Sequence, residues 1–420
     1  LFCWFFFMPE YTRKEVAKHD QVDDAWIIID DKVYDVTNWS FKHPGGRVIL
    51  YYRGQDATEP VYGFHPDIEK TKKYMKSICV GNVKEESDNP ISPVIADFRK
   101  LRIELENEGA FKPRFSFYFA YFLQIVFFEL LAVASIYYTQ SIVLTAIILA
   151  TSQIQAGWQQ HDFGHCAVFK SATLNQIAHY LFIGIFKGAF SWWWKSRHNR
   201  HHAKTNYLKL DPDMHVEPMF SFSEELVSKP KWKPNKRFVP FLPLQKYYWF
   251  VFGPPTVTTI YFVIDNAIFM AKRGLAIDMI AVYSFFVRFD LVYSNFLSPW
   301  QVICLYFGMR FIESHWFTWV TSMNHLPMPK VEDPKSEDWV TFQLRGTQNV
   351  EGGLFNDWFT GYLNYQIEHH LFPNMPRHKY PEIAPRVQEL CKKHGITYHS
   401  TTLWKSFVDV VDKLSDVSSK

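Results

Sequence analysis

Two long apolar stretches dominate the hydrophobic pattern in the middle of the chain, at residues 115–138 and 141–158. A helix needs about 20 residues to cross the hydrocarbon core of a bilayer, and both stretches come close to that length. Glu129 is the only charged residue in the first stretch, and only Thr139 and Gln140 separate the two. Such a short connection predicts a hairpin of two antiparallel helices.

Three further apolar stretches, at residues 247–271, 277–298 and 300–320, carry charged residues and are weaker candidates for membrane spans. Ionisable side chains are expensive in lipid and usually face a protein interior or a polar cavity. The stretch 174–194 is also apolar, but it contains a histidine and a lysine. We expect it to lie on or under a cytosolic cap rather than to span the bilayer, with the closing Trp192–Trp194 either an interfacial anchor or a wall of the substrate channel.

The first part of the chain has a different, charged and compact pattern. The segment WIIIDDKVYDVT predicts two strands joined by a turn at Asp30-Asp31. Asn89-Pro90 and Ser92-Pro93 interrupt regular structure further on, which favours a flexible tether between two domains. We therefore divide the chain as follows: 1–7, an artefact or upstream extension; 8–85, a small α+β domain; 86–110, a linker; 111–420, an α-helical membrane domain.

Composition narrows the possible functions. Phe, Tyr and Trp supply 18% of the residues, about twice the share expected of a soluble domain, and such rings concentrate at lipid headgroups. The formal net charge is only +3, and no basic run resembles a nucleic-acid-binding patch. The five cysteines form no CxxC pair, which favours reduced thiols over a disulfide framework.

Eight of the 17 histidines fall in four groups. Three groups read HDFGH from His161, HNRHH from His198 and QIEHH from Gln366, and the fourth is His325 alone. Spacings of three and four residues put side chains on one face of a helix, with Cβ atoms about 5–6 Å apart. Three such groups beside aromatic-rich apolar stretches predict a metal site larger than one ion.

A shared metal site also constrains the membrane topology. The histidine groups must then lie on one side of the bilayer, so an even number of spans separates the second group from the third. We expect 277–298 and 300–320 to cross and 247–271 to be amphipathic or re-entrant. This gives about four transmembrane helices and a cytosolic cap that holds the histidines. The alternative is a large soluble all-α protein.

Two other histidines lie in loops of the first domain. His43 begins the sequence HPGG, and His65 lies in GFHPD after a short helical stretch. Two such histidines could clamp one iron from opposite faces of a haem. This order of motifs resembles cytochrome b5, in which the residues matching His43 and His65 are the axial ligands of haem b. Ligation by two histidines leaves no open position, so this haem would carry electrons.

Histidine alone does not identify the metal of the larger site, because imidazole binds iron, zinc, copper and nickel. A fused electron-transfer haem favours a redox metal, and iron is the simplest choice. The boxes HxxxH, HxxHH and QxxHH, after two apolar spans and a cytochrome b5-like domain, resemble the front-end fatty acyl desaturases of animals (the Δ5/Δ6 type). The resemblance runs from about Tyr11 to the end and implies a diiron site with these ligands: His161, His165, His198, His201, His202, His325, His369 and His370.

Two positions bear on this resemblance. Gln366 opens the third box in place of a histidine, as in the front-end subgroup, and it would bind iron weakly or hold a water. Lys246 stands where relatives often have a histidine, and a protonated amine cannot bind metal. Five carboxylates are plausible partners for the imidazole N–H groups: Asp162, Asp211, Asp213, Glu368 and Asp357.

The resemblance implies the reaction and its partners. Electrons would pass from NADH, through NADH-cytochrome b5 reductase, to the haem and then to the two non-haem irons. With O2 as cosubstrate, the irons would insert a cis double bond between an existing double bond and the carboxyl end of a polyunsaturated acyl-CoA. The protein would be a multi-pass protein of the endoplasmic reticulum membrane, with its N-terminus, haem domain and histidine boxes cytosolic.

Three alternatives remain open at this point. A sphingolipid long-chain-base desaturase shares the haem fusion and the histidine boxes. A fatty acid hydroxylase also carries a haem domain, but its histidine spacings differ. A non-catalytic membrane haem protein would pass electrons to a partner and bind no non-haem iron. Regioselectivity (Δ5, Δ6 or Δ8) depends on the shape of an apolar channel and cannot be predicted from these motifs.

Overall fold

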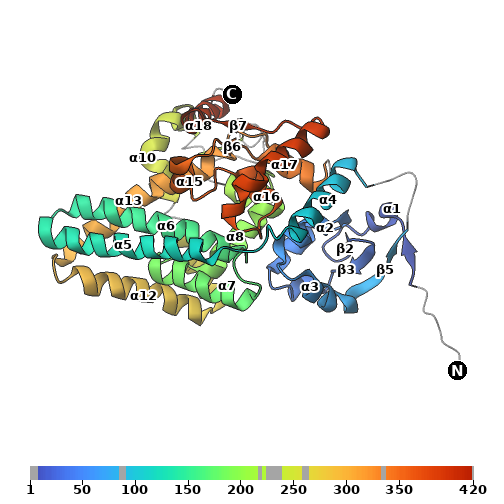
Figure 1. The fold of residues 1–420 in the computed structure, drawn as a ribbon, viewed down its shortest axis with the longest axis horizontal. Helices are drawn as coiled ribbons and strands as arrows, with labels where there is room; N and C mark the ends of the chain where they lie inside the picture. Colours follow the sequence, from blue (N-terminus) through green and yellow to red (C-terminus); the bar gives the residue numbers. More distant parts are fainter. Residues whose placement is uncertain are drawn as a thin grey trace.

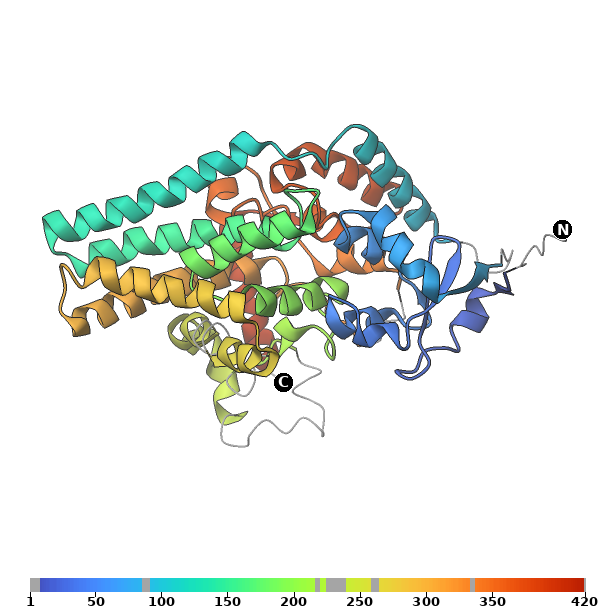
Figure 2. The same ribbon diagram turned by 90° about the horizontal axis from the view of Figure 1, so that it is seen from below.

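A computed structural model describes residues 8–84, 91–215, 220–223, 239–257, 264–332 and 337–418. The apolar residues 1–7 and the start of the expected linker lie outside the described residues, as do 258–263 of the stretch 247–271. In both ribbon views the small N-terminal domain lies at one end of the molecule and a bundle of long helices extends to the other (Figures 1 and 2).

The N-terminal domain is built on a five-stranded mixed sheet of order β1-β5-β3-β2-β4. The predicted hairpin is confirmed: β2 and β3 pair in antiparallel register, and Asp30 in the turn has a φ of 57°. Apolar side chains of Ile27–Ile29 and Val33 are buried against short helices. The elements are β1 Glu10–Tyr11, α1 Arg13–Val16, β2 Trp26–Ile29, β3 Lys32–Asp35, β4 Gln55–Asp56, α2 Thr58–Phe64, α3 Ile68–Met75 and β5 Cys79–Val83.

The helix α4 (Pro93–Asn107) joins the two domains, and the flexible tether expected from the sequence is wrong for this segment. Its apolar face includes Phe98 and Leu101, which belong to one buried core with residues of both domains. Its polar side is bonded to the N-terminal domain: Arg99 forms an ion pair with Glu59 at 2.5 Å, and Arg102 donates to the Tyr62 carbonyl at 3.1 Å. In its described part, residues 91–110, the expected linker is therefore mostly a helix packed against both domains.

Four long helices run side by side away from the N-terminal domain (Figure 1). They are α5 Phe115–Thr139, α6 Ile142–Gly164, α12 Ala276–Tyr293 and α13 Pro299–Met323. The first two form the predicted hairpin, and Gln140 between them has a φ of 54°. Among the described residues one helix, α5, is long and apolar enough to cross a membrane by composition. Large apolar side chains are exposed along it at Phe115, Phe119, Leu123, Phe127 and Leu130.

Shorter elements form a cap around one end and one side of this bundle, and part of the cap lies next to the N-terminal domain (Figure 1). The expected stretch 174–194 is no single helix, because a π-helical segment at Tyr180–Phe186 and a loop divide it. The described part of 247–271 forms two separate helices. The cap elements are α7 Ala172–His179, α8 Ser191–Ala203, α10 Gln245–Val257, α11 Asn266–Arg273, α14 Trp339–Gly346, β6 Asn349–Val350, α15 Leu354–Thr360, α16 Gln366–Leu371, α17 Tyr380–Lys393, β7 Ser400–Thr401 and α18 Leu403–Ser418.

Candidate haem and metal sites

The two histidines of the N-terminal domain face each other across a gap. His43 follows a short turn of helix at Trp39–Phe41, and His65 ends α2. Their ring centres are 6.1 Å apart. An iron placed between two imidazoles, with bonds of about 2 Å, would separate the ring centres by roughly this distance.

Both rings are oriented by main-chain carbonyls. The Nδ1–H of His43 donates to the Gly46 carbonyl at 3.0 Å, and that of His65 donates to the Val61 carbonyl at 2.8 Å. This leaves each Nε2 as a ligand atom and fixes the tautomer that a metal requires. Burial lowers the pKa of His65 to about 4, so its ring is neutral. A Cβ at position 45 would lie 2.9 Å from the His43 ring, which explains the glycine. These residues fit a haem held by two histidines.

The structure brings together all eight histidines of the four sequence groups. One set contains His161, His165, His198, His202 and His369, and the other contains His201, His325 and His370. Within each set the candidate ligand atoms lie within 4.8 Å of one another. The two sets adjoin, because the rings of His202 and His370 stack at 4.0 Å between centres. Residues more than 200 positions apart therefore form one cluster with two centres.

Distances between ring nitrogens test whether metal ions fit these sets. The Nε2 atom of His198 lies 3.0 Å from that of His161 and 3.1 Å from that of His202. In the second set, the Nε2 atoms of His201 and His325 are 3.3 Å apart. Two imidazoles that share a divalent metal at bonds of about 2 Å have nitrogens roughly 3 Å apart. Each set can therefore accept one ion.

Unpartnered atoms point to the same conclusion. The Nε2 atoms of His165, His369 and His370 are buried and have no hydrogen-bond partner. Buried polar atoms in native proteins almost always have a partner, so these three nitrogen atoms are suited to bind metal ions. Burial also lowers the pKa values of His202, His369 and His370 well below the ordinary value. The rings are then neutral, which is the form that binds metal.

The predicted carboxylate partners divide into two groups. Asp211 Oδ2 lies 3.0 Å from Nδ1 of His201 and also accepts the Asn206 N–H at 2.7 Å. Asp213 and Asp162 are more distant, at 3.7 Å from Nδ1 of His201 and 3.8 Å from Nδ1 of His161. Asp162 also accepts the Tyr118 hydroxyl at 2.6 Å. Asp211 is therefore the carboxylate best placed to orient an imidazole.

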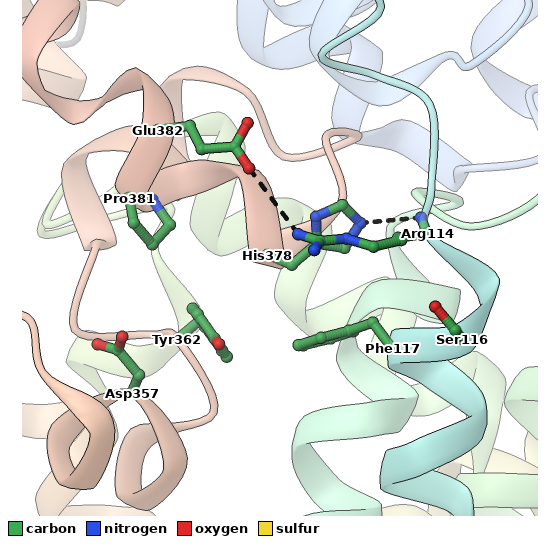
Figure 3. Close-up of a pocket in the computed structure, with 8 residues that line it drawn as sticks. All are labelled: Arg114, Ser116, Phe117, Asp357, Tyr362, His378, Pro381 and Glu382. Carbon is green, nitrogen blue, oxygen red and sulfur yellow. Dashed lines mark hydrogen bonds and ion pairs between the residues drawn. The ribbon is translucent and has the colours of Figure 1, made fainter.

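The other two carboxylates have different partners. Glu368 accepts from Asn349 at 2.7 Å and from Tyr398 at 2.9 Å, so its side chain braces the cap. Asp357 accepts from Asn364 at 2.9 Å and lines a separate surface hollow with Arg114 and His378 (Figure 3). Glu368 and Asp357 were predicted as imidazole partners because they are close to histidine boxes in the sequence. The sequence does not show in which direction a carboxylate points.

Several orienting groups have no sequence signature. Nδ1 of His370 lies 2.8 Å from Gln343 Oε1, and Nδ1 of His369 lies 3.1 Å from the Tyr380 hydroxyl. The Nδ1–H of His325 donates to the Gly346 carbonyl at 3.2 Å. These groups come from α14 and α17, which contain no histidine box. A glutamine or tyrosine on another helix could be found only from tertiary structure.

A cavity with aromatic walls opens beside the cluster. Its polar end contains His161, His198, His201, His325 and Gln366. Trp193 and Trp194 line it too, and the Trp194 ring stacks on His198 at 4.3 Å between centres. Of the two expectations for Trp192–Trp194, the channel wall therefore holds for these two. Further wall residues are Trp158, Phe222, Trp249, Phe317 and Leu363.

Comparison with known proteins identifies both parts of the chain. A family model described as "Fatty acid desaturase" matches residues 139–402, and one described as "Cytochrome b5-like Heme/Steroid binding domain" matches residues 12–84. The chain belongs to the fatty acid desaturase family. Among solved structures, the cytochrome b5 of Ostreococcus tauri virus 2 is 39% identical, with coverage of 18% of this chain and 95% of that one and a TM-score of 0.17.

Membership of the desaturase family makes the protein an oxidoreductase, and the fused cytochrome b5-like domain gives it its own electron donor. The family and the histidine sets together point to iron, and the first domain points to haem. A b5 domain also implies electron transfer from a reductase, and the desaturase domain implies lipid substrates.

The structure also places Gln366 and Lys246, the two residues that the sequence comparison noted in place of a histidine. The Gln366 Nε2 lies 2.8 Å from Nε2 of His325, and its buried Oε1 has no partner. Its amide is thus at the second set, where an ion or its water would be. Lys246 lies on α10, and its Nζ donates to Ser415 of α18 at 3.1 Å. This lysine does not line the cavity beside the histidine sets.

Proposed function

We propose that the protein is a front-end fatty acyl desaturase that inserts a cis double bond between an existing double bond and the carboxyl end of a polyunsaturated acyl-CoA. The observation that carries the proposal is the position of the two histidine sets at the polar end of a cavity with aromatic walls. A saturated or unsaturated hydrocarbon chain fits against the aromatic and aliphatic side chains of this wall, because contact between apolar surfaces excludes water. Gln366 supports the front-end subgroup.

The proposed roles of the residues follow from the geometry. His161, His165, His198, His202 and His369 hold one non-haem iron, and His201, His325 and His370 hold the other, with Gln366 at its open side. When bound, the pair of irons supplies the activation of O2 that removes two hydrogens from unactivated carbons. The protein holds the imidazole rings in place, excludes water and positions one methylene of the acyl chain beside the irons. His43 and His65 hold the haem that supplies the electrons.

We also propose that α5, α6, α12 and α13 cross the membrane of the endoplasmic reticulum, with both metal sites on its cytosolic side. The exposed apolar stripe on α5 supports this, as do exposed side chains on the outer helices. These include Ile280, Tyr283, Leu291, Trp300 and Phe307. An apolar surface of this extent is unusual on a soluble protein. NADH-cytochrome b5 reductase would then reach the haem from the cytosol.

Feeding single polyunsaturated fatty acids to yeast that expresses the chain tests the proposal. We expect a new double bond on the carboxyl side of an existing one, located by mass spectrometry of the fatty acids. The matched control is His202→Ala, which should give no product. New unsaturation in the long-chain bases, with none in fatty acids, would contradict the proposal in favour of a sphingolipid desaturase. Absence of non-haem iron would favour an electron carrier.

A further inference from the structure

The N-terminal domain is docked directly on the segments that carry the second and third histidine boxes. The hydroxyl of Tyr52 donates to the carbonyl of Ala203, the residue after His202, at 2.6 Å. From the other side, Asn374 Nδ2 donates to the carbonyl of Tyr62 at 3.0 Å. Both hydrogen bonds join a segment next to a haem ligand with a segment next to the iron cluster. The domain is therefore held in one orientation towards the cluster.

The backbone at position 63 is in contact with the loop that follows the third histidine box. A Cβ built there would lie 3.4 Å from Cγ of Pro373, so the backbone of α2 lies against the loop that follows the third box. A larger side chain would push α2 away from this loop. The space at position 63 accepts a small side chain but no bulky one, so this position controls how closely the helix that ends at His65 approaches the loop.

Phe64 lies next to both sites. It is the residue before His65, and its ring meets the His202 ring edge-on, with centres 6.5 Å apart and planes at 89°. Nδ1 of His202 is buried and has no hydrogen-bond partner, so no polar group intervenes at that atom. Phe64 is therefore adjacent in sequence to a proposed haem ligand, and its ring packs against a proposed iron ligand.

From this arrangement we infer that Phe64 is the packed bridge by which electrons pass from the haem to the non-haem irons, through His202, in the docked state. Each transfer takes one electron from ferrous haem iron, which becomes ferric, and reduces one ferric non-haem iron to the ferrous state. Two transfers supply the pair of electrons for one turnover with O2. The haem is re-reduced by the flavoprotein reductase. The inference rests on the proposed function, and it requires no swing of the haem domain.

The test follows the haem spectrum of the full-length protein and needs no acyl substrate. Anaerobic protein with haem and two ferric non-haem irons is mixed with one electron equivalent of dithionite, and loss of ferrous haem absorbance is timed. We expect Phe64→Ala to slow haem re-oxidation several-fold, and Phe64→Leu, which keeps packed atoms in the gap, to slow it less. The matched control is Tyr74→Ala, an aromatic side chain of the same domain that is 62% exposed.

A second pair of variants tests the docked state at a single position. Gly63→Trp should push α2 from Pro373 and slow re-oxidation, whereas Gly63→Ala should leave the rate near that of the wild type. Haem content and non-haem iron content are measured in every variant, so loss of a cofactor is recognised. Wild-type protein stripped of non-haem iron should keep its haem reduced.

A wild-type rate of haem re-oxidation in Phe64→Ala would overturn the assigned role of Phe64, and a wild-type rate in Gly63→Trp would overturn transfer in the docked state. A wild-type haem that stays reduced while both non-haem irons are present would overturn both. Failure of the proposed function has a different signature, since it shows as absence of product in the feeding experiment. Haem re-oxidation can still be timed in a protein that makes no product.

Discussion

The haem site and the histidine cluster bind metals through the same side chain but are built in opposite ways. At the haem site, each ring is held by a carbonyl three or four residues away, Gly46 for His43 and Val61 for His65. In the cluster, the rings come from four distant segments, and His201, His369 and His370 are held by side chains of further elements. A site fixed by local backbone depends on one small domain, whereas the cluster depends on the whole cap.

The largest expected effects separate the two sites. His65→Ala should abolish haem binding and leave non-haem iron in place, because the cluster shares no ligand with the haem site. His369→Ala should lower non-haem iron and leave the haem spectrum unchanged. Visible absorbance and metal analysis of the purified proteins measure both quantities. Simultaneous loss of haem and non-haem iron in either variant would contradict the independence of the two sites.

A smaller effect is expected where the cluster depends on a remote side chain. Asp211→Asn removes the charge 3.0 Å from Nδ1 of His201, and loss of such a partner typically reduces metal affinity or activity by about 10–100-fold. The matched variant is Asp213→Asn, whose carboxylate is 3.7 Å from the same atom and pairs with Arg197. Iron titration should show a much weaker effect for Asp213. Equal effects of the two substitutions would contradict the assigned role of Asp211.

The same contrast explains what the sequence could predict. Helical spacing predicted that His161 and His165, or His198, His201 and His202, share a face, since that depends only on the helix. The sequence also predicted the hairpin of β2 and β3 and the pairing of α5 with α6. Gln343 and Tyr380 were missed because their role comes from packing between helices far apart in the chain.

The docking of the haem domain could not be predicted for a related reason. Prolines 90 and 93 signal a break in regular structure, but they say nothing of the apolar face of α4 that follows. That face joins the cores of the two domains through Phe98, which packs near Trp339 and Phe372. The residues around position 93 determine where α4 starts. Whether the segment is a flexible tether or a packed helix depends on the residues of both domains that α4 contacts.

A moderate effect is expected from the cap of α8, the helix that carries three of the cluster histidines. Asp278 of α12 accepts the N–H groups of Ser191 at 2.8 Å and Trp192 at 3.2 Å, at the start of α8. Removal of such a cap costs about 1 kcal/mol. Asp278→Ala should lower the unfolding temperature and weaken iron binding, measured by thermal scans and metal analysis. Asp290→Ala, at an exposed position of the same helix, is the control, and an equal loss there would contradict the capping role.

The smallest effect is expected at Lys246, where the resemblance to relatives led us to expect a histidine. Its Nζ donates to Ser415 at 3.1 Å, so α10 meets the C-terminal helix α18 at this point. The eight clustered histidines come instead from α6 and its C-cap, from α8, from α16 and from the turn that follows α13. A histidine at position 246 would therefore face α18 and add no ligand. We expect Lys246→His to leave iron content and product formation unchanged and to alter stability only slightly, as Lys246→Gln should also do. A gain of iron or product in Lys246→His alone would show that the cluster extends to α10 and lacks a ligand in this chain.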